Sequence, residues 1–213
     1  MHSLSKLGLA GTLAWTASAV LAAPPAIVTQ GKGAAIACAI CHGEEGGGNA
    51  QAGYPALARL PAAYIAKQLA DFKAGTRRNA VMSPIAAALQ AEDVDAAARY
   101  FADLPRPKPA AVAADAALVA RGKDLANSGD WGRQIPPCFK CHATDGTGVP
   151  PHFPPIAGQN APYTEAQLKA WQAGTRANDP QKLMRTVARH LTADDVRAVA
   201  AYLATLGPQE GTK

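Results

Sequence analysis

The sequence contains two copies of the pattern C-x-x-C-H, and together they use all four of its cysteines. This pattern is typical of covalent haem attachment, because two thiols form thioethers with the haem vinyl groups and the next residue lies beneath the iron. Two disulfides or a zinc site would use the same residue types, but neither needs a histidine after each second cysteine. The sequence therefore predicts two covalently attached haem c groups, held by Cys38, Cys41, Cys138 and Cys141, with His42 and His142 as axial ligands.

The two motifs belong to an internal repeat. The segment Tyr54-Pro55-Ala56-Leu57-Ala58 matches Phe153-Pro154-Pro155-Ile156-Ala157 at an offset of 99 residues. Further along the chain the offset becomes 102, and Met82 then matches Met184. Agreements that keep one order and are interrupted only by small insertions indicate a duplicated domain. We therefore expect the two halves to fold in the same way.

The spacing of apolar residues predicts an all-α fold. Apolar side chains recur at helical spacing, and the β-branched alternation of strands is nearly absent. Each half is expected to have a short helix before its haem motif, a Gly-rich loop, an amphipathic helix (62–73 and 163–172), an irregular loop that carries the methionine, and a closing helix (91–104 and 193–206). Thr192 and Asp195 form a capping-box pattern, with Asp in place of the usual Glu.

The chain is expected to divide at a proline-rich segment. Alternating prolines in residues 105–112 favour a stiff, extended linker between a first domain, 24–104, and a second domain, 113–208. Residues 1–23 have the pattern of a secretory signal, with Lys6 before an apolar stretch and small residues at a cleavage site after Ala22 or Ala23. A retained anchor is the alternative, but the stretch is short for a span of about 20 residues. We expect export to a periplasm.

Met82 and Met184 are the candidates for the sixth iron ligands. They are the only methionines outside the signal, and the repeat makes them equivalent. A thioether opposite histidine raises the potential and fills the sixth position of the iron. His152 and His190 are rival ligands, but neither has an equivalent in the first half, so we expect both to be surface or loop histidines.

Several residues are candidates for the surroundings of the haems. The carbonyls of Pro55 and Pro154 are placed to accept the Nδ1–H of His42 and His142, which would make each imidazole a stronger donor. Two arginines are candidates to pair with a haem propionate, or else are solvated helix ends. Four aromatic residues pack either on the haems or on helices. These residues are Arg77, Arg176, Tyr64, Tyr163, Phe72 and Trp171.

The formal net charge of the chain is +5. Four ionised propionates would nearly neutralise it, and together with export this argues against nucleic acid as a partner. The charge is uneven, because residues 24–104 carry seven basic and seven acidic side chains, whereas 105–213 carry thirteen basic and nine acidic ones. The second half is therefore the more cationic docking surface, unless these charges merely solvate helices.

These features together resemble the dihaem, two-domain class I cytochromes c of the c-four type, over nearly the whole mature chain. The resemblance implies two all-α cytochrome domains related by a pseudo-two-fold axis, His/Met ligation in each, and periplasmic electron transfer, often to a terminal oxidase. The family element Leu-Ala-Gly-Gln is Ile156-Ala157-Gly158-Gln159 in the second half but Leu57-Ala58-Arg59-Leu60 in the first. An additional segment, 128–137, resembles a loop of dihaem subunits of periplasmic dehydrogenases; the alternative is a surface loop without a function of its own.

The function expected from these features is that of an electron carrier and not of an enzyme. The protein would pass single electrons between protein partners such as a dehydrogenase, a quinol-oxidising complex or a terminal oxidase. It could associate peripherally with a membrane complex. We expect it to need no metal besides haem iron. The alternative is a dedicated cytochrome subunit of a periplasmic dehydrogenase. A dihaem peroxidase is a further alternative, but it needs an open iron, against which Met82 and Met184 argue.

Overall fold

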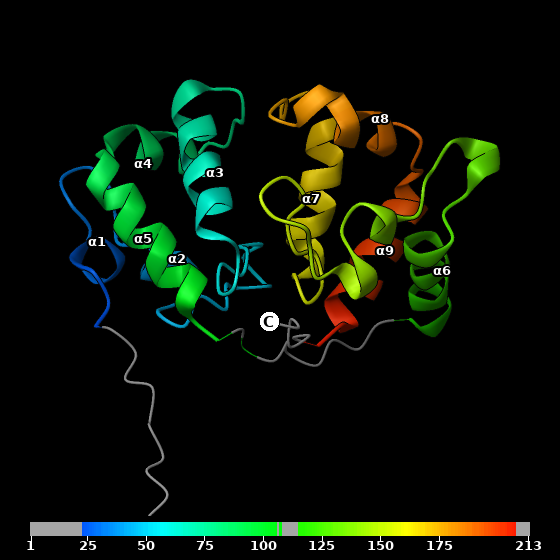
Figure 1. The fold of residues 1–213 in the computed structure, drawn as a ribbon, viewed down its shortest axis with the longest axis horizontal. Coiled ribbons are helices and arrows are strands. Elements are labelled where there is room, and N and C mark those ends of the chain that lie inside the picture. Colours follow the sequence, from blue (N-terminus) through cyan, green and yellow to red (C-terminus); the bar gives the residue numbers. More distant parts are fainter. Residues whose placement is uncertain (1–22, 106, 108–114, 208–213) are drawn as a thin grey trace, which may run out of the picture.

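The computed structural model describes residues 23–105, 107 and 115–207, and the regular structure within them is helical, with only isolated β-bridges between extended residues. Two similar helical units lie next to each other (Figure 1). The predicted all-α, two-domain architecture is thereby confirmed. The expected signal cleavage site lies at the edge of the described residues, and most of the linker lies outside them, so the domain boundaries stay predictions. Within the described ranges no helix is long and apolar enough to cross a membrane.

The helices of the two halves correspond one to one after the haem motif. The first half contains α1 (Ala26–Thr29), α2 (Ala39–His42), α3 (Ala62–Ala74), α4 (Met82–Ala88) and α5 (Ala91–Asp103). The second contains α6 (Ala116–Asn127), α7 (Ala161–Gln172), α8 (Leu183–Ala188) and α9 (Ala193–Thr205), with short 3₁₀ turns at Trp131–Arg133, Cys138–Lys140, Thr144–Gly146 and Pro180–Lys182. The four long helices expected from the sequence end within two residues of their predicted bounds.

The prediction that the methionines lie in irregular loops is wrong. Met82 is the first residue of α4, and Met184 lies in the first turn of α8. The side chain of Asn79 explains the early start of α4, because its Oδ1 accepts hydrogen bonds from the N–H groups of Val81 and Met82, each at 2.9 Å. The first N–H groups of a helix need such partners. The capped turn fixes the backbone from which Met82 projects.

Each half has an apolar core of its own. The first core gathers around Val28, Ile65 and Phe101, and the second around Leu125, Ile135 and Val196. In the second half the long helix α6 packs on α9 at Gly122, where an added Cβ would lie 2.0 Å from the carbonyl oxygen of Ala198. Glycine is therefore required for this close crossing of the two helices.

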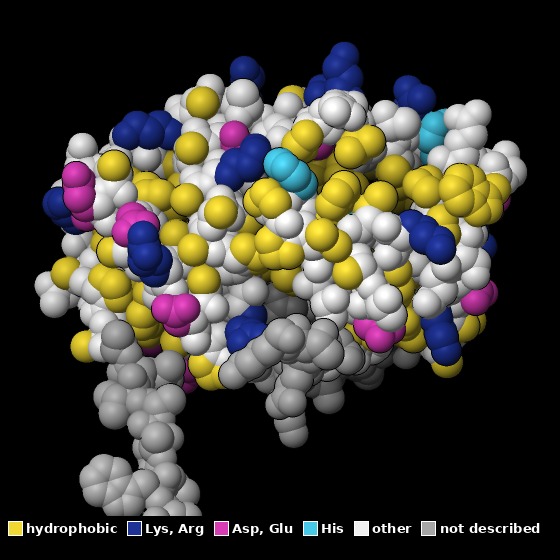
Figure 2. Space-filling model, viewed as in Figure 1, with side chains coloured by type: hydrophobic (Ala, Val, Ile, Leu, Met, Phe, Trp, Pro, Cys, Tyr) yellow, Lys and Arg dark blue, Asp and Glu magenta, His cyan; other side chains and the backbone are white. Residues whose placement is uncertain are grey.

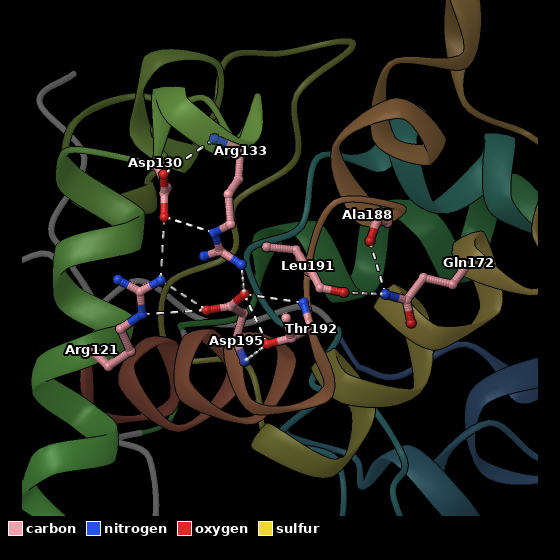
Figure 3. A network of polar contacts seen from close by, with 8 residues as sticks. All are labelled: Arg121, Asp130, Arg133, Gln172, Ala188, Leu191, Thr192 and Asp195. Carbon is pink, nitrogen blue, oxygen red and sulfur yellow. Dashed lines mark hydrogen bonds and ion pairs between the residues drawn. The ribbon is translucent and has the colours of Figure 1, made fainter.

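The additional segment 128–137 is fixed to the second domain by the carboxylate of Asp195 (Figure 3). Asp195 is only 3% exposed; it accepts hydrogen bonds from Arg133 Nη1 at 2.6 Å and from Arg121 Nη2 at 3.1 Å, and it completes the predicted capping box with Thr192. Burial acts to raise the pKa of Asp195, but the hydrogen bonds from Arg133, Thr192 and Arg121 outweigh it and hold the pKa well below its usual range. The loop thus rests on an ion-paired anchor at the start of α9.

The halves meet across a polar interface whose contacts come in reciprocal pairs. The N–H of Arg78 donates to the carbonyl of Thr175 at 3.2 Å, and the N–H of Ala177 donates to the carbonyl of Thr76 at 2.9 Å. Each bond is the repeat equivalent of the other, so the contacts have the pseudo-two-fold relation expected from the resemblance. Extended residues Arg77 and Arg176 lie between them as an antiparallel bridge.

Candidate haem sites

One helical turn brings the thiols and the imidazole of each motif together. In the first half the N–H groups of Cys41 and His42 donate to the carbonyl of Cys38, at 3.3 and 3.0 Å. The second half repeats both bonds at 3.2 and 3.0 Å around Cys138. Both histidines are 7% exposed. Two thiols and a buried imidazole on one turn are the donor set that covalent haem attachment requires.

The Nδ1 atom of each of these histidines is held by a proline carbonyl. His42 Nδ1 lies 3.0 Å from the oxygen of Pro55, and His142 Nδ1 lies 2.8 Å from the oxygen of Pro154. A carbonyl can only accept, so Nδ1 carries the proton and Nε2 keeps its lone pair for a metal. Burial lowers the pKa of both histidines despite these bonds, which favours the neutral, metal-binding form.

Glycines of the loop after each motif hold the proline segment in place. The N–H of Gly48 donates to the carbonyl of His42 at 2.9 Å, and that of Gly148 to the carbonyl of His142 at 2.7 Å. Gly48 has a φ of +73°, and a Cβ on it would lie 2.5 Å from the carbonyl carbon of Pro55. The sequence marked this loop only as Gly-rich, whereas its role is to let the proline segment approach the histidine.

Met82 and Met184 occupy equivalent places, each half-buried in the first turn of a helix that packs on α3 or α7. Met184 also packs against the second core, as do Cys138 and Phe139. The rival histidines lie elsewhere. His152 is exposed, and the Nε2 of His190 accepts a hydrogen bond from Arg189 Nε at 3.2 Å just after α8.

The interpretation of Arg77 and Arg176 as solvated helix ends is wrong, because they are 6% and 5% exposed at the domain interface. Arg77 donates across the interface to Tyr163 Oη at 2.8 Å and to Gln167 Oε1 at 2.7 Å. Arg176 donates to Tyr64 Oη and Gln68 Oε1, each at 3.2 Å. Sequence periodicity cannot reveal this burial, because it arises only when two domains meet.

The guanidiniums also stack on aromatic rings of their own domains. Arg77 lies 4.4 Å from the ring centre of Phe72, and Arg176 lies 4.0 Å from that of Trp171. Burial alone would lower the pKa of Arg77, but Tyr163 and Tyr64 raise it above its usual value. Burial acts to raise the pKa of Tyr163, whereas Arg77 and Arg176 lower it, and the net pKa lies below its ordinary value.

This part of the interface suits a group that brings negative charge. The oxygens bonded to both guanidiniums come from amides and phenols, while the nearby carboxylate of Asp71 bonds to Lys67 and Asn178. The Trp171 Nε1 donor is buried without a partner in the described part of the chain. Two buried cations with neutral partners and an unpaired donor that packs against the second core fit a haem whose propionates accept hydrogen bonds.

Gln159 and Asn160 are interface residues that sequence reasoning missed. Gln159 Oε1 accepts from the N–H of Ala56 at 2.9 Å, and its Nε2 donates to the carbonyl of Ala56 at 3.0 Å. Asn160 Nδ2 donates to the carbonyl of Tyr54 at 2.8 Å. The available signal was the mismatch within the repeat, because the buried amide of Gln159 stands where the first half has Leu60.

Comparison with known proteins gives family matches over both halves. Residues 119–207 match the model for "Cytochrome c", and residues 26–101 match that for "Cytochrome C oxidase, cbb3-type, subunit III". The chain is 49% identical to a thiosulfate dehydrogenase electron acceptor of Stutzerimonas stutzeri (strain A1501), over 86% of each chain. It is 45% identical to a protein of the same description from Thiomonas intermedia (strain K12), over 96% of this chain and 91% of the other. Identity to cytochrome c4 of Pseudomonas aeruginosa is 34%, over 81% and 85%.

Two solved structures resemble this one closely. The thiosulfate dehydrogenase TsdBA of Marichromatium purpuratum superposes with a TM-score of 0.78 and 42% identity over 86% of this chain. The match spans only 39% of that longer chain. The reduced recombinant cytochrome c4 of Pseudomonas stutzeri superposes with a TM-score of 0.73 and 33% identity, over 79% of this chain and 93% of the other.

Proposed function

Because this chain belongs to the family of dihaem cytochromes c of the c4 type, we propose that it accepts single electrons from a thiosulfate-oxidising dehydrogenase and passes them to another redox protein. The family makes it a dihaem electron-transfer protein with two covalently bound haem c groups. The choice of donor rests on one observation, the 49% identity to a thiosulfate dehydrogenase electron acceptor over 86% of each chain. The secretory-signal pattern of residues 1–23 supports a periplasmic location.

In this proposal His42 and Met82 would hold the first haem iron, and His142 and Met184 would hold the second. Haem supplies a one-electron couple when bound. The protein fixes the imidazoles through the carbonyls of Pro55 and Pro154 and keeps them buried, which lowers their pKa. With a methionine thioether as the further ligand, the bound haem would favour the reduced state and would offer no open position for peroxide. This ligand set supports a carrier and argues against a peroxidase.

The surface supports both brief encounters and a lasting complex. Hydrophobic side chains extend over both halves of the face in Figure 2, and Lys and Arg side chains line its upper edge. Such an apolar face with a charged rim suits short-lived redox encounters. Trp131 is 70% exposed on the anchored loop 128–137, and this favours a second mode, in which the protein is a stable subunit of the dehydrogenase.

The proposal is tested by mixing the oxidised holoprotein with a purified thiosulfate dehydrogenase and following haem absorbance. We expect both haems to become reduced only when thiosulfate and the enzyme are both present. An alcohol dehydrogenase with its own substrate is the matched control for the donor. The proposal is overturned if dithionite reduces both haems but the thiosulfate system reduces neither. Copurification of wild type but not of Trp131→Ala would favour the stable subunit.

A further inference from the structure

A single peptide unit connects the first haem site to the second domain. The carbonyl of Pro55 accepts from His42 Nδ1 at 3.0 Å, and the N–H of the same peptide, on Ala56, donates to Gln159 Oε1 at 2.9 Å. Ala56 and Gln159 are both buried. Hydrogen bonds therefore run in series from Gln159, across the domain interface and through one amide group, to His42.

The amide of Gln159 is held in the orientation that this series needs. Its Nε2 donates to the carbonyl of Ala56 at 3.0 Å, and its Oε1 also accepts the N–H of Asn160 at 3.0 Å. Two backbone N–H groups thus point at one oxygen, and one backbone carbonyl accepts from the nitrogen. These partners fix the orientation of the Gln159 amide, so that its oxygen and not its nitrogen faces the N–H of Ala56.

The second half cannot form the same series. Its equivalent peptide joins Pro154 to Pro155, and proline has no N–H to donate. The residue equivalent to Gln159 is Leu60, which has no amide. The second half thus lacks both the backbone N–H that Ala56 supplies and the amide oxygen that Gln159 supplies. The hydrogen bond from His142 Nδ1 to the carbonyl of Pro154 is retained at 2.8 Å. The series serves the first site alone.

Hydrogen bonds in series polarise one another, so donation by Ala56 makes the Pro55 carbonyl a stronger acceptor. A stronger acceptor at Nδ1–H makes the imidazole a stronger donor to iron, which favours the oxidised state. We propose that Gln159 is a positioning residue of the second domain that lowers the reduction potential of the first haem, and so directs electrons from the first haem to the second. This rests on the axial role proposed for His42, and it does not depend on which protein donates the electrons.

The direct test is a redox titration of the isolated holoprotein carrying Gln159→Leu, the residue that the first half has. We expect an upward shift of the first haem's midpoint potential and none for the second, with the two haems distinguished by NMR. The His42 Nδ1 proton is expected to move upfield as its hydrogen bond weakens, and that of His142 to stay. Equal shifts of both potentials, or none, would overturn the proposal. Because no partner protein is present, this outcome is independent of the test for thiosulfate dehydrogenase.

Asn160→Ser is the matched control variant. It removes the bond to the Tyr54 carbonyl but keeps a side chain that can cap α7, and it leaves the Gln159–Ala56 contact in place. We expect the first haem's potential to stay as in the wild type. A shift as large as that of Gln159→Leu would mean that loosening of the segment, and not the series of bonds, sets the potential, and the proposal would fail.

Rebuilding the series in the second half gives an independent test. Pro155→Ala restores a backbone N–H, and Leu60→Gln supplies the amide at the equivalent position. We expect the double variant to lower the second haem's potential by more than the sum of the two single changes. Strict additivity of the two substitutions in a folded double variant would contradict the proposal.

Discussion

The closing helices of the two domains carry equivalent aspartates in their first turns, and these aspartates are anchored in different ways. In the first domain Asp93 pairs at 3.1 Å with Lys32, whose side chain is largely exposed. In the second domain Asp195 is buried between Arg121 and Arg133, and it holds a loop that the first domain does not have. One position of the repeat thus serves as a surface ion pair in one copy and as an internal anchor in the other.

The contacts around the two histidines are, by contrast, nearly the same. The proline carbonyl, the glycine N–H bond and the helical turn recur in both halves with distances that agree within 0.2 Å. A covalent haem requires the same geometry of its thiols and imidazole in each domain. The copies therefore differ mainly where they touch each other or carry additional chain, and the following predictions test how far the equivalence extends.

The largest expected effect comes from the sixth ligands. Met82→His and Met184→His each replace a soft thioether by a stronger donor, so each is expected to lower one haem potential by on the order of tenths of a volt, within the roughly 0.8 V range that axial ligands cover. Redox titration with NMR assignment of the haems measures this. If both variants lowered the same potential, the equivalence of the two sites would be broken.

A smaller effect is expected at the anchor of the second domain. Asp195→Asn removes one of the two carboxylates that Arg121 and Arg133 share, while Asp130 still pairs with Arg133 at 2.8 Å and with Arg121 at 3.7 Å. We expect a loss of about 2 kcal/mol in the unfolding free energy, since the remaining carboxylate and the partial exposure of both arginines limit the effect. Asp93→Asn is the matched variant in the first domain and is expected to cost less, because it loses only a surface pair. Denaturant titration followed at each haem gives both values. Equal losses would show that burial of the aspartate adds nothing.

The anchor also predicts a pH dependence of the stability of the second domain. The pKa of Asp195 lies below its unfolded value, so its contribution is complete above about pH 4 and is lost as pH falls towards the folded pKa. As pH falls below about 4, the unfolding free energy of the wild type is expected to decrease relative to that of Asp195→Asn, by up to about 1.4 kcal/mol per pH unit. Parallel acid-unfolding profiles of the two proteins would contradict this.

The smallest expected effect concerns a backbone position at which the repeats differ. Arg59 has a φ of +65°, where the second half has Gly158 at +69°. Both N–H groups donate to the closing helix, to the carbonyls of Phe101 and Leu203. Side chains are strained in this region, so Arg59→Gly is expected to stabilise the first domain by about 1 kcal/mol. Thermal unfolding measures the gain, and a loss would mean that the arginine side chain makes an offsetting contact.

Local patterns in the sequence were sufficient to predict the fold and the haem motifs. Apolar spacing marked α3, α5, α7 and α9, and the capping pattern at Thr192 marked the start of α9. The early start of α4 was missed, because it depends on the side chain of Asn79, which a periodicity argument does not weigh. Local signals succeed where residues close in sequence decide the structure.

The domain interface could not be predicted in the same way. The burial of Arg77 and Arg176 and the contact of Gln159 with Ala56 join residues about 100 positions apart. The charge of the arginines suggested either propionates or solvent, and neither interpretation anticipates phenol and amide partners from the other domain. Only the difference between Gln159 and Leu60 within the repeat pointed to this surface.

The reciprocal bonds at the interface bear on how fast an electron can pass between the two irons. Backbone bonds at Arg78 and Ala177, together with the buried guanidiniums, hold both domains in one relative orientation. A stiff arrangement keeps the haem-to-haem distance constant without a search through hinge positions. Transfer within the molecule would then be governed by tunnelling distance and driving force, and it would be insensitive to solvent viscosity.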